Sequence, residues 1–343
     1  MADSSIISLA DTLPFPILLV SPAQRVLHAN SGAEALLGTG LVGRTLVTVL
    51  RQPGLIEAVE AVLAGQGRQQ VRLRLGSQGR ESQVLVTVAA LAEGSLVLTF
   101  EDRTAVETAE AMRRDFVANV SHELRTPLTA LMGFVETLRG AAKDDPVARD
   151  RFLAIMEREA GRMNRLVGDL LSLSRVEAEE RRRPTTGTDL GAVLRGAMQA
   201  LAPLAEARQV QLLREGLTEG LKIPADPDQL TQVFTNLIEN AIKYGGSGGE
   251  VRISVDKIDY EPVLRGAALR VVVADRGEGI DPIHLPRLTE RFYRIDTHRS
   301  REQGGTGLGL AIVKHIVLRH RGRMKIESEK GQGSRFLILL PVS

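Results

Sequence analysis

Residues 121–128 read Ser-His-Glu-Leu-Arg-Thr-Pro-Leu, within a stretch whose apolar side chains recur every three or four positions. Leu124, Leu128 and Leu131 fall close to one line of an α-helix, which turns by ~100° per residue. If that line is the buried side, His122 projects from the opposite face. Most exposed histidines on helices are ordinary surface residues, so the meaning of this one depends on the rest of the chain.

The apolar pattern extends over two long stretches and predicts a helical hairpin. We expect helices at 105–140 and 147–182, with a turn at 143–146. A single hairpin cannot cover its own apolar stripes, whereas two hairpins from two chains can do so as a four-helix bundle. We therefore expect a homodimer through residues 108–180. Pro127 removes a backbone hydrogen bond and should kink the first helix just past His122.

Three further motifs follow in order. Residues 236–244 read Asn-Leu-Ile-Glu-Asn-Ala-Ile-Lys-Tyr, residues 275–279 read Asp-Arg-Gly-Glu-Gly, and residues 304–310 read Gly-Gly-Thr-Gly-Leu-Gly-Leu. Asn236 and Asn240 share one helix face, and a carboxamide oxygen suits a Mg²⁺ ion that already carries phosphate oxygens. Glycine-rich backbone leading into a helix is a general anion site.

Together, these motifs resemble the H, N, G1 and G2 boxes of sensor histidine kinases of two-component systems. Residues 122–127 have the pattern His-Glu-x-x-Thr-Pro, which is similar to that of phosphate-regulon sensors. The resemblance covers about residues 111–343. It implies that His122 is phosphorylated by ATP and passes the phosphoryl group to an aspartate of a cognate response regulator. It also implies that Glu123 accepts or directs the ring proton and that Thr126 positions water for a phosphatase reaction on the regulator.

The same resemblance implies roles in the nucleotide site. Asn240 holds Mg²⁺ with support from Asn236, Lys243 contacts phosphate, Tyr244 packs against adenine, and Asp275 accepts its amino hydrogen. Residues 290–294 match the F box, with Phe292 under an ATP lid at 294–304 that should order only on nucleotide. The remaining cofactor-binding residues are glycines and their neighbours in the two loops: Gly277, Gly279, Gly305, Thr306, Gly307, Leu308 and Gly309.

The chain is expected to be a multidomain α+β protein. Residues 1–103 contain short strand-like stretches in an order similar to a PAS sensor domain, and residues 102–104 resemble the Asp-x-Thr exit of such domains. Residues 104–184 form the dimerisation and phosphotransfer hairpin. Residues 185–343 alternate helix and strand, which predicts an α/β sandwich that binds ATP, of the GHKL (Bergerat) type. The arginine run at 181–183 reads best as a solvated helix end.

Composition sets limits on the function. Lys and Arg total 44 against 42 Asp and Glu, and the net charge of +2 gives no reason to expect nucleic-acid binding. The chain has no cysteine, which fits a reducing compartment. No apolar run reaches the ~18 residues needed to span a bilayer. We therefore expect a soluble, cytoplasmic protein, with membrane association only through a region absent from this chain.

Four other functions and one other cofactor can be compared with this interpretation. A zinc protease motif would need a second histidine where Thr126 stands, and a Walker P-loop needs a Gly-Lys pair that the chain lacks. A GHKL-fold ATPase, as in gyrase, MutL or Hsp90, would have a glutamate in place of Asn236 to activate water. A non-catalytic sensory scaffold would have lost His122, Asn240 or the glycines. His28 could suggest a haem ligand, but a lone histidine is usually structural.

Overall fold

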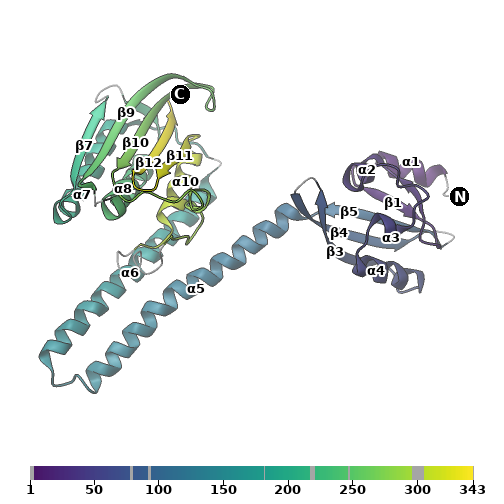
Figure 1. Cartoon of the computed structure of the whole chain (residues 1–343), viewed down its shortest axis with the longest axis horizontal. Coiled ribbons are helices and arrows are strands. Elements are labelled where there is room, and N and C mark those ends of the chain that lie inside the picture. Colours follow the sequence, from purple (N-terminus) through teal and green to yellow (C-terminus); the bar gives the residue numbers. More distant parts are fainter. Residues whose placement is uncertain are drawn as a thin grey trace. The chain divides into compact units, whose positions relative to one another are not determined.

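The computed structural model describes residues 4–77, 80–91, 94–180, 182–216, 221–245, 248–295 and 305–342. The chain divides into two compact units, Met1–Ala118 and Asn119–Ser343. Helix α5 (Thr104–Arg139) contributes to both units (Figure 1). Among the described residues, no helix combines the length and the apolar character needed to cross a membrane.

The first unit is built on a five-stranded antiparallel sheet in the order β2-β1-β5-β4-β3. The elements are α1 (Ser4–Thr12), β1 (Ile17–Val20), β2 (Val26–Ala29), α2 (Ser31–Leu37), α3 (Leu46–Val49), α4 (Pro53–Leu63), β3 (Gln69–Ser77), β4 (Arg80–Ala90) and β5 (Leu96–Asp102). The strands expected from the sequence are confirmed, whereas α1, α3 and α4 were not predicted.

Strand alternation gives this sheet two covered faces. Leu18 and Val20 belong to the main core, while Ile17 and Leu19 point the other way and pack with α1. His28 lies outside the main core, and its Nε2 is 2.8 Å from a carboxylate oxygen of Asp11 on α1. Asp11 therefore gives this histidine a structural partner.

Two short hydrogen bonds fix the exit from the sheet into α5. The Asp102 carboxylate accepts the backbone N–H of Thr104 at 2.8 Å, and the Thr104 hydroxyl accepts the N–H of Gln83 on β4 at 2.8 Å. The hydrogen bonds from Thr104 hold the pKa of Asp102 below its ordinary value. The Asp-x-Thr sequence thus joins the last strand to the helix and to the neighbouring strand.

The second unit begins with the rest of α5 and with α6 (Pro146–Glu179), which form the expected hairpin. Asp145 caps α6 by accepting the N–H groups of Val147 and Ala148, and Pro146 occupies its first turn. The helix assignment of α5 runs unbroken through Pro127, the one buried residue in it. The second helix was predicted to run to 182, whereas α6 ends at Glu179, with Glu180 as its C-cap.

The hairpin leaves apolar side chains uncovered within one chain. On α5 they recur at spacings of four and three, and on α6 at fourteen and four, so each set shares one helix face. The residues in these two rows are Leu128, Met132, Val135, Leu153, Val167 and Leu171; Val106, Met112, Val117 and Val147 of the same helices are also exposed. By contrast, Leu166, Leu173 and Val176 of α6 are buried.

The remainder of the second unit is an α/β sandwich. Its main sheet has the order β11-β12-β10-β9-β7, all antiparallel except that β7 runs parallel to β9. The elements are β6 (Gly187–Asp189), α7 (Leu190–Ala207), β7 (Gln211–Gly216), β8 (Lys222–Pro224), α8 (Pro227–Gly245), β9 (Glu250–Glu261), β10 (Gly266–Asp275), the 3₁₀ turn η3 (Leu285–Arg287), α10 (Gly309–Arg319), β11 (Arg323–Glu329) and β12 (Gly333–Pro341).

Helices α7, α8 and α10 pack against this sheet, and α8 lies centrally against β9, β10 and β12. Side chains of the strands alternate between buried and more exposed, as Val251, Ile253 and Val255 do on β9. Asp275 is the last residue of β10, so the carboxylate expected to bind adenine lies where the buried core gives way to loops. β7 and the small β6–β8 pair were not predicted.

Candidate active site

Helix α8 carries the two asparagines of the nucleotide motif at the border of its buried face. Leu237, Ile238 and Ala241 are almost completely buried, whereas Asn236 and Asn240 are partly exposed. The Nδ2 group of Asn236 is buried and has no hydrogen-bond partner among the described residues. A buried donor without a partner is costly, and it fits a site in which a ligand or its water completes the bonding.

The carboxylate of Asp275 is held by two backbone donors. Its Oδ1 accepts the N–H of Gly277 at 2.9 Å and the N–H of Ser334 at 3.2 Å. Burial raises the pKa of Asp275 above its ordinary value, and these two hydrogen bonds oppose the rise. The carboxylate is thus fixed in position and partly desolvated, which strengthens any further hydrogen bond that it accepts.

Two glycines let the loop after β10 approach other backbone closely. A Cβ on Gly277 would lie 2.6 Å from the Cα of Gly245, at the end of α8. Gly279 has a φ of +68°, and a Cβ there would lie 2.0 Å from the carbonyl oxygen of Glu329. Both positions therefore require glycine. The contact at Gly277 brings the loop to Tyr244, whose ring is 43% exposed.

The glycine-rich loop runs into the N-terminus of α10. The capping position, Leu308, makes no side-chain hydrogen bond to the first turn, which leaves backbone donors for an anion. The carbonyl of Gly307 accepts the N–H of Phe292 at 2.8 Å. Both residues have positive φ, +73° and +64°, and for Phe292 this is a strained conformation held by the surrounding structure. Phe292 is half-buried. The predicted lid at 294–304 lies outside the described residues, except for its first two positions.

Several groups expected to contact phosphate have carboxylate partners in this structure. Nζ of Lys243 lies 2.6 Å from Oε1 of Glu239, one turn earlier on α8. The hydroxyl of Thr306 donates to Oδ2 of Asp169 on α6 at 2.6 Å. The sequence assigned no role to Glu239, and it gave no signal for Asp169.

His122 is exposed on α5, as the sequence predicted. The hydroxyl of Thr126 donates to the backbone carbonyl of His122 at 3.2 Å, which places Thr126 beside it on the helix surface. Oε2 of Glu123 lies 2.8 Å from Nη2 of Arg162 on α6 and 3.5 Å from Nη1 of Arg294. Two arginines that sequence reasoning did not single out therefore hold the predicted proton acceptor.

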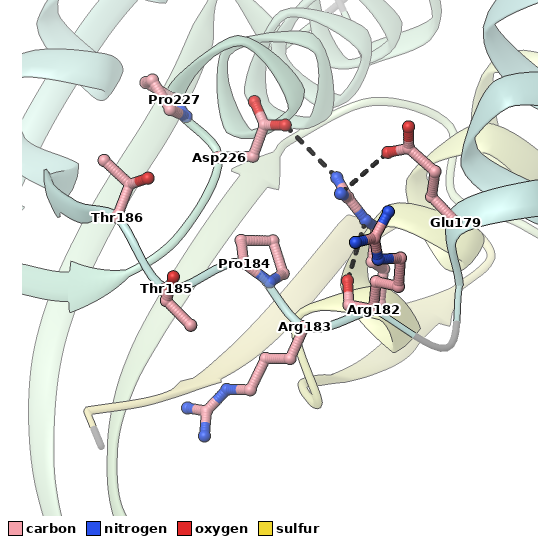
Figure 2. A pocket seen from close by; sticks show the side chains of 9 residues that line it. Glu179, Arg182, Arg183, Pro184, Thr185, Thr186, Asp226 and Pro227 are labelled. Atoms are coloured by element: carbon pink, nitrogen blue, oxygen red, sulfur yellow. Dashed lines mark hydrogen bonds and ion pairs between the residues drawn. The ribbon is translucent and has the colours of Figure 1, made fainter.

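A pocket of about 560 Å³ lies where α6 leads into the sandwich (Figure 2). The guanidinium of Arg319 bonds Glu179 at 2.8 Å, Asp226 at 3.2 Å and the carbonyl of Arg182 at 3.2 Å. Asp226 in turn accepts the N–H groups of Asp228 and Gln229 at the start of α8. Arg182 thus takes part in a structural contact through its backbone, whereas Arg181 lies outside the described residues.

The site residues fit a nucleotide with a bound magnesium ion. They offer a fixed, partly desolvated carboxylate at Asp275, a buried donor at Asn236 that has no partner among the described residues, and an uncapped helix N-terminus. The described residues contain no group of three histidine, aspartate or glutamate side chains that could hold a metal by itself. A metal held by Asn240 would therefore take its other ligands from phosphate and water, as Mg²⁺ commonly does.

The fold and the site define an ATP-binding domain of the GHKL class, joined to a phosphoacceptor hairpin. Residues 225–343 match the histidine kinase-, DNA gyrase B- and HSP90-like ATPase family, residues 112–179 match the His Kinase A (phospho-acceptor) domain, and residues 10–108 match the PAS fold. The chain belongs to the sensor histidine kinases. The predicted boundaries 1–103, 104–184 and 185–343 remain predictions.

Relatives with known names support this membership. The chain is 43% identical over 243 residues to the phosphate regulon sensor protein PhoR of Pseudomonas aeruginosa, covering 70% of this chain and 52% of PhoR. It is 38% identical over 245 residues to the sensor-like histidine kinase SenX3 of Mycolicibacterium smegmatis, covering 71% of this chain and 62% of SenX3. The matched region thus spans about half to three-fifths of these relatives.

One solved structure shares the fold along the chain. The crystal structure of histidine kinase ThkA in complex with response regulator protein TrrA aligns with a TM-score of 0.51 at 20% sequence identity, covering 98% of both chains. The similarity extends over the PAS-like sheet, the hairpin and the sandwich.

Replacing Asp275 by asparagine should weaken ATP binding without lowering the stability of the fold. Asparagine keeps an oxygen for Gly277 and Ser334 but removes a desolvated charge. Burial raises the pKa of Asp275 in the folded state. At a pH above this pKa, the ionised carboxylate therefore lowers the free energy of unfolding. Asp275→Asn should therefore keep or raise the free energy of unfolding at pH 7. ATP binding should weaken by ~1.5–3 kcal/mol, the value of a hydrogen bond to a charged group.

The measurements are chemical denaturation and calorimetric titration with ATP. The affinity of the wild type should fall as the pH is lowered toward the raised pKa, because Asp275 becomes protonated, and the affinity of the variant should change less. Equal ATP affinity in the wild type and the variant at pH 7 would remove Asp275 from the adenine site.

Proposed function

We propose that this chain is an ATP-dependent protein histidine kinase, which phosphorylates His122 and transfers the phosphoryl group to an aspartate of a cognate response regulator. One observation carries the proposal: an exposed histidine on a helical hairpin occurs in the same unit as a desolvated carboxylate and a glycine-rich loop at a helix N-terminus. The three family matches agree with this combination.

In the proposed reaction, a neutral ring nitrogen of His122 attacks the γ-phosphorus of ATP. The bond from that phosphorus to the β,γ-bridging oxygen breaks, and ADP leaves with the bonding electrons. Glu123 accepts the proton that the ring loses. Arg162, on the second helix of the hairpin, lies 2.8 Å from this carboxylate (Nη2 to Oε2), so the position of the carboxylate is fixed by the hairpin itself.

The nucleotide is held from several sides. Asp275 accepts the adenine amino hydrogen, and Tyr244 at the end of α8 covers the base. Lys243 and the loop of residues 305–309 contact the phosphates, which requires Lys243 to leave Glu239. Asn240 binds Mg²⁺, which would neutralise charge on the phosphates during transfer. Asn236 donates its unsatisfied N–H group toward this assembly.

Transfer to a regulator requires that a second protein reach the same imidazole. His122 is exposed on the hairpin, which permits docking of a receiver domain. ThkA, which shares the fold, was crystallised with a response regulator. Because the reaction consumes ATP, we place the catalytic part of the protein in the cytoplasm.

A plain GHKL-fold ATPase is a weaker reading. Hydrolysis in that class uses a glutamate to activate water, and Asn236 cannot act as a base. A purely sensory scaffold is also disfavoured, because the nucleotide site and the exposed histidine are both intact. A phosphatase activity on the phosphorylated regulator is the second candidate function, favoured by the exposed Thr126 beside His122.

Autophosphorylation is tested with γ-labelled ATP and Mg²⁺. The wild type should acquire a label that is acid-labile and alkali-stable, and His122→Ala should acquire none while binding ADP normally. Glu123→Gln should slow labelling by ~10²–10⁴-fold, the range for general base catalysis. Labelling of His122→Ala at the wild-type rate would refute the assignment.

The chain should be a homodimer through residues 108–180. The apolar faces of α5 and α6 exposed in one chain need a second hairpin to cover them. Light scattering should give about twice the chain mass of 37.2 kDa. Leu171→Glu, at a site 68% exposed in one chain, should shift the protein toward monomer. A folded, monomeric wild type at micromolar concentration would contradict the dimer.

Thr126→Ala should impair the phosphatase reaction but not the kinase reaction. The hydroxyl can position water at a docked phosphoaspartate, whereas transfer from ATP has no use for it. Dephosphorylation of the regulator should slow by about tenfold to a thousandfold, as for loss of one oriented hydrogen bond. The assay follows the decay of phosphorylated regulator with kinase and ADP. Equal decay with both proteins would leave Thr126 as a surface residue only.

A further inference from the structure

The C-terminal half of α6 is docked against the sandwich through polar contacts along one face. Ser172 donates to Oε1 of Gln232 on α8 at 2.9 Å, and Glu177 accepts Nη2 of Arg291 at 2.6 Å. Nδ1 of His315 on α10 lies 3.0 Å from Oε2 of Glu180. The buried Leu173 and Val176 lie on the same stretch of α6. Most of these contacts join residues outside the nucleotide site.

One residue of this face, Asp169, contacts the glycine-rich loop of residues 305–309. The Thr306 hydroxyl donates to Oδ2 of Asp169 at 2.6 Å and accepts the N–H of Leu308 at 3.3 Å. Thr306 is only 8% exposed, so this carboxylate closes the loop beside the uncapped start of α10. Glu239 and Lys243 of α8 are close enough to act electrostatically on Asp169, which places this carboxylate at the proposed phosphate end of the site.

We propose that Asp169 competes with the phosphates of ATP for the hydroxyl of Thr306, so that this one contact lowers nucleotide affinity and nucleotide binding breaks this contact. A carboxylate resembles a phosphate oxygen pair as an anionic hydrogen-bond acceptor, and two such anions cannot occupy one donor. The coupling is reciprocal, since each event must weaken the other by the same factor. This inference rests on the proposed function, in which the loop binds the triphosphate.

The contact is suited to displacement. Burial raises the pKa of Asp169 above its ordinary value, which means that the docked structure disfavours the charged carboxylate; the hydrogen bond from Thr306 opposes this rise. The charges of Arg165 and Lys243 also favour ionisation, and Glu239 disfavours it. An incoming polyanion therefore displaces a partner whose own burial is unfavourable.

The test is calorimetric titration of the full chain with ADP and with ATP. Asp169→Ala should bind nucleotide at least about fivefold more tightly than the wild type, the lower end of typical coupling between sites. Asp169→Asn keeps the shape without the charge and should change affinity in the same direction by less. The matched control is Ser172→Ala, which removes a contact of the same face away from the loop and should leave affinity nearly unchanged.

A double-mutant cycle isolates the hydrogen bond. In a Thr306→Val background, Asp169→Ala should no longer tighten nucleotide binding, because the shared hydroxyl is gone. Unchanged or weaker binding by both Asp169 variants would overturn the competition. Equal tightening by Ser172→Ala would also overturn it, since docking as a whole would then be responsible. A wild type that binds no nucleotide would instead overturn the proposed function on which the inference rests.

Discussion

The guanidinium of Arg319 is the contact on which the arrangement of the second unit depends. It joins the end of α6, the backbone of the linker at Arg182 and the capping residue of α8, Asp226 (Figure 2). A guanidinium has five N–H donors fixed in one plane, whereas a lysine ammonium has three donors on a single atom at the end of a flexible chain. The asparagines of α8 are therefore oriented relative to the hairpin by a residue that lies outside both sites.

The nucleotide site contains features that a purely structural core would avoid. Asp275 is a desolvated carboxylate, Asn236 has an unsatisfied buried donor, and Phe292 has left-handed backbone geometry. Each lowers stability, and each lies at a predicted ligand contact. Strain and unsatisfied polar groups are tolerated where a ligand binds, although the described residues carry others elsewhere, such as Nε of Arg270 and the positive φ of Arg265. The surrounding apolar residues of α8, β9 and β10 offset these losses.

The sequence predicted those parts that depend on local pattern. The helical hairpin was predicted from its apolar repeat, and the exposure of His122 followed from the apolar stripe alone. Edge strand β7 was missed because its sequence, Gln-Leu-Leu-Arg-Glu-Gly, has no alternation of apolar and polar residues, and none of its residues is fully buried. The partners Asp169 and Thr306 are 137 positions apart, and only the folded chain brings them together. The sequence therefore supplied the proposed roles of the site residues, which remain predictions, but not the contacts between distant segments.

The hydrogen bond from Thr306 to Asp169 also bears on which anions the loop accepts. Inorganic phosphate or sulfate would have to displace the Asp169 carboxylate from Thr306, and such a small ion has no other contact to help it. In the proposed function, a nucleotide adds the contact of its base with Asp275, and the binding energy of that contact would help to displace the carboxylate. The Asp169 carboxylate would thus make the loop selective. Abundant small anions would bind weakly, whereas a ligand with both a base and a polyphosphate could displace the carboxylate.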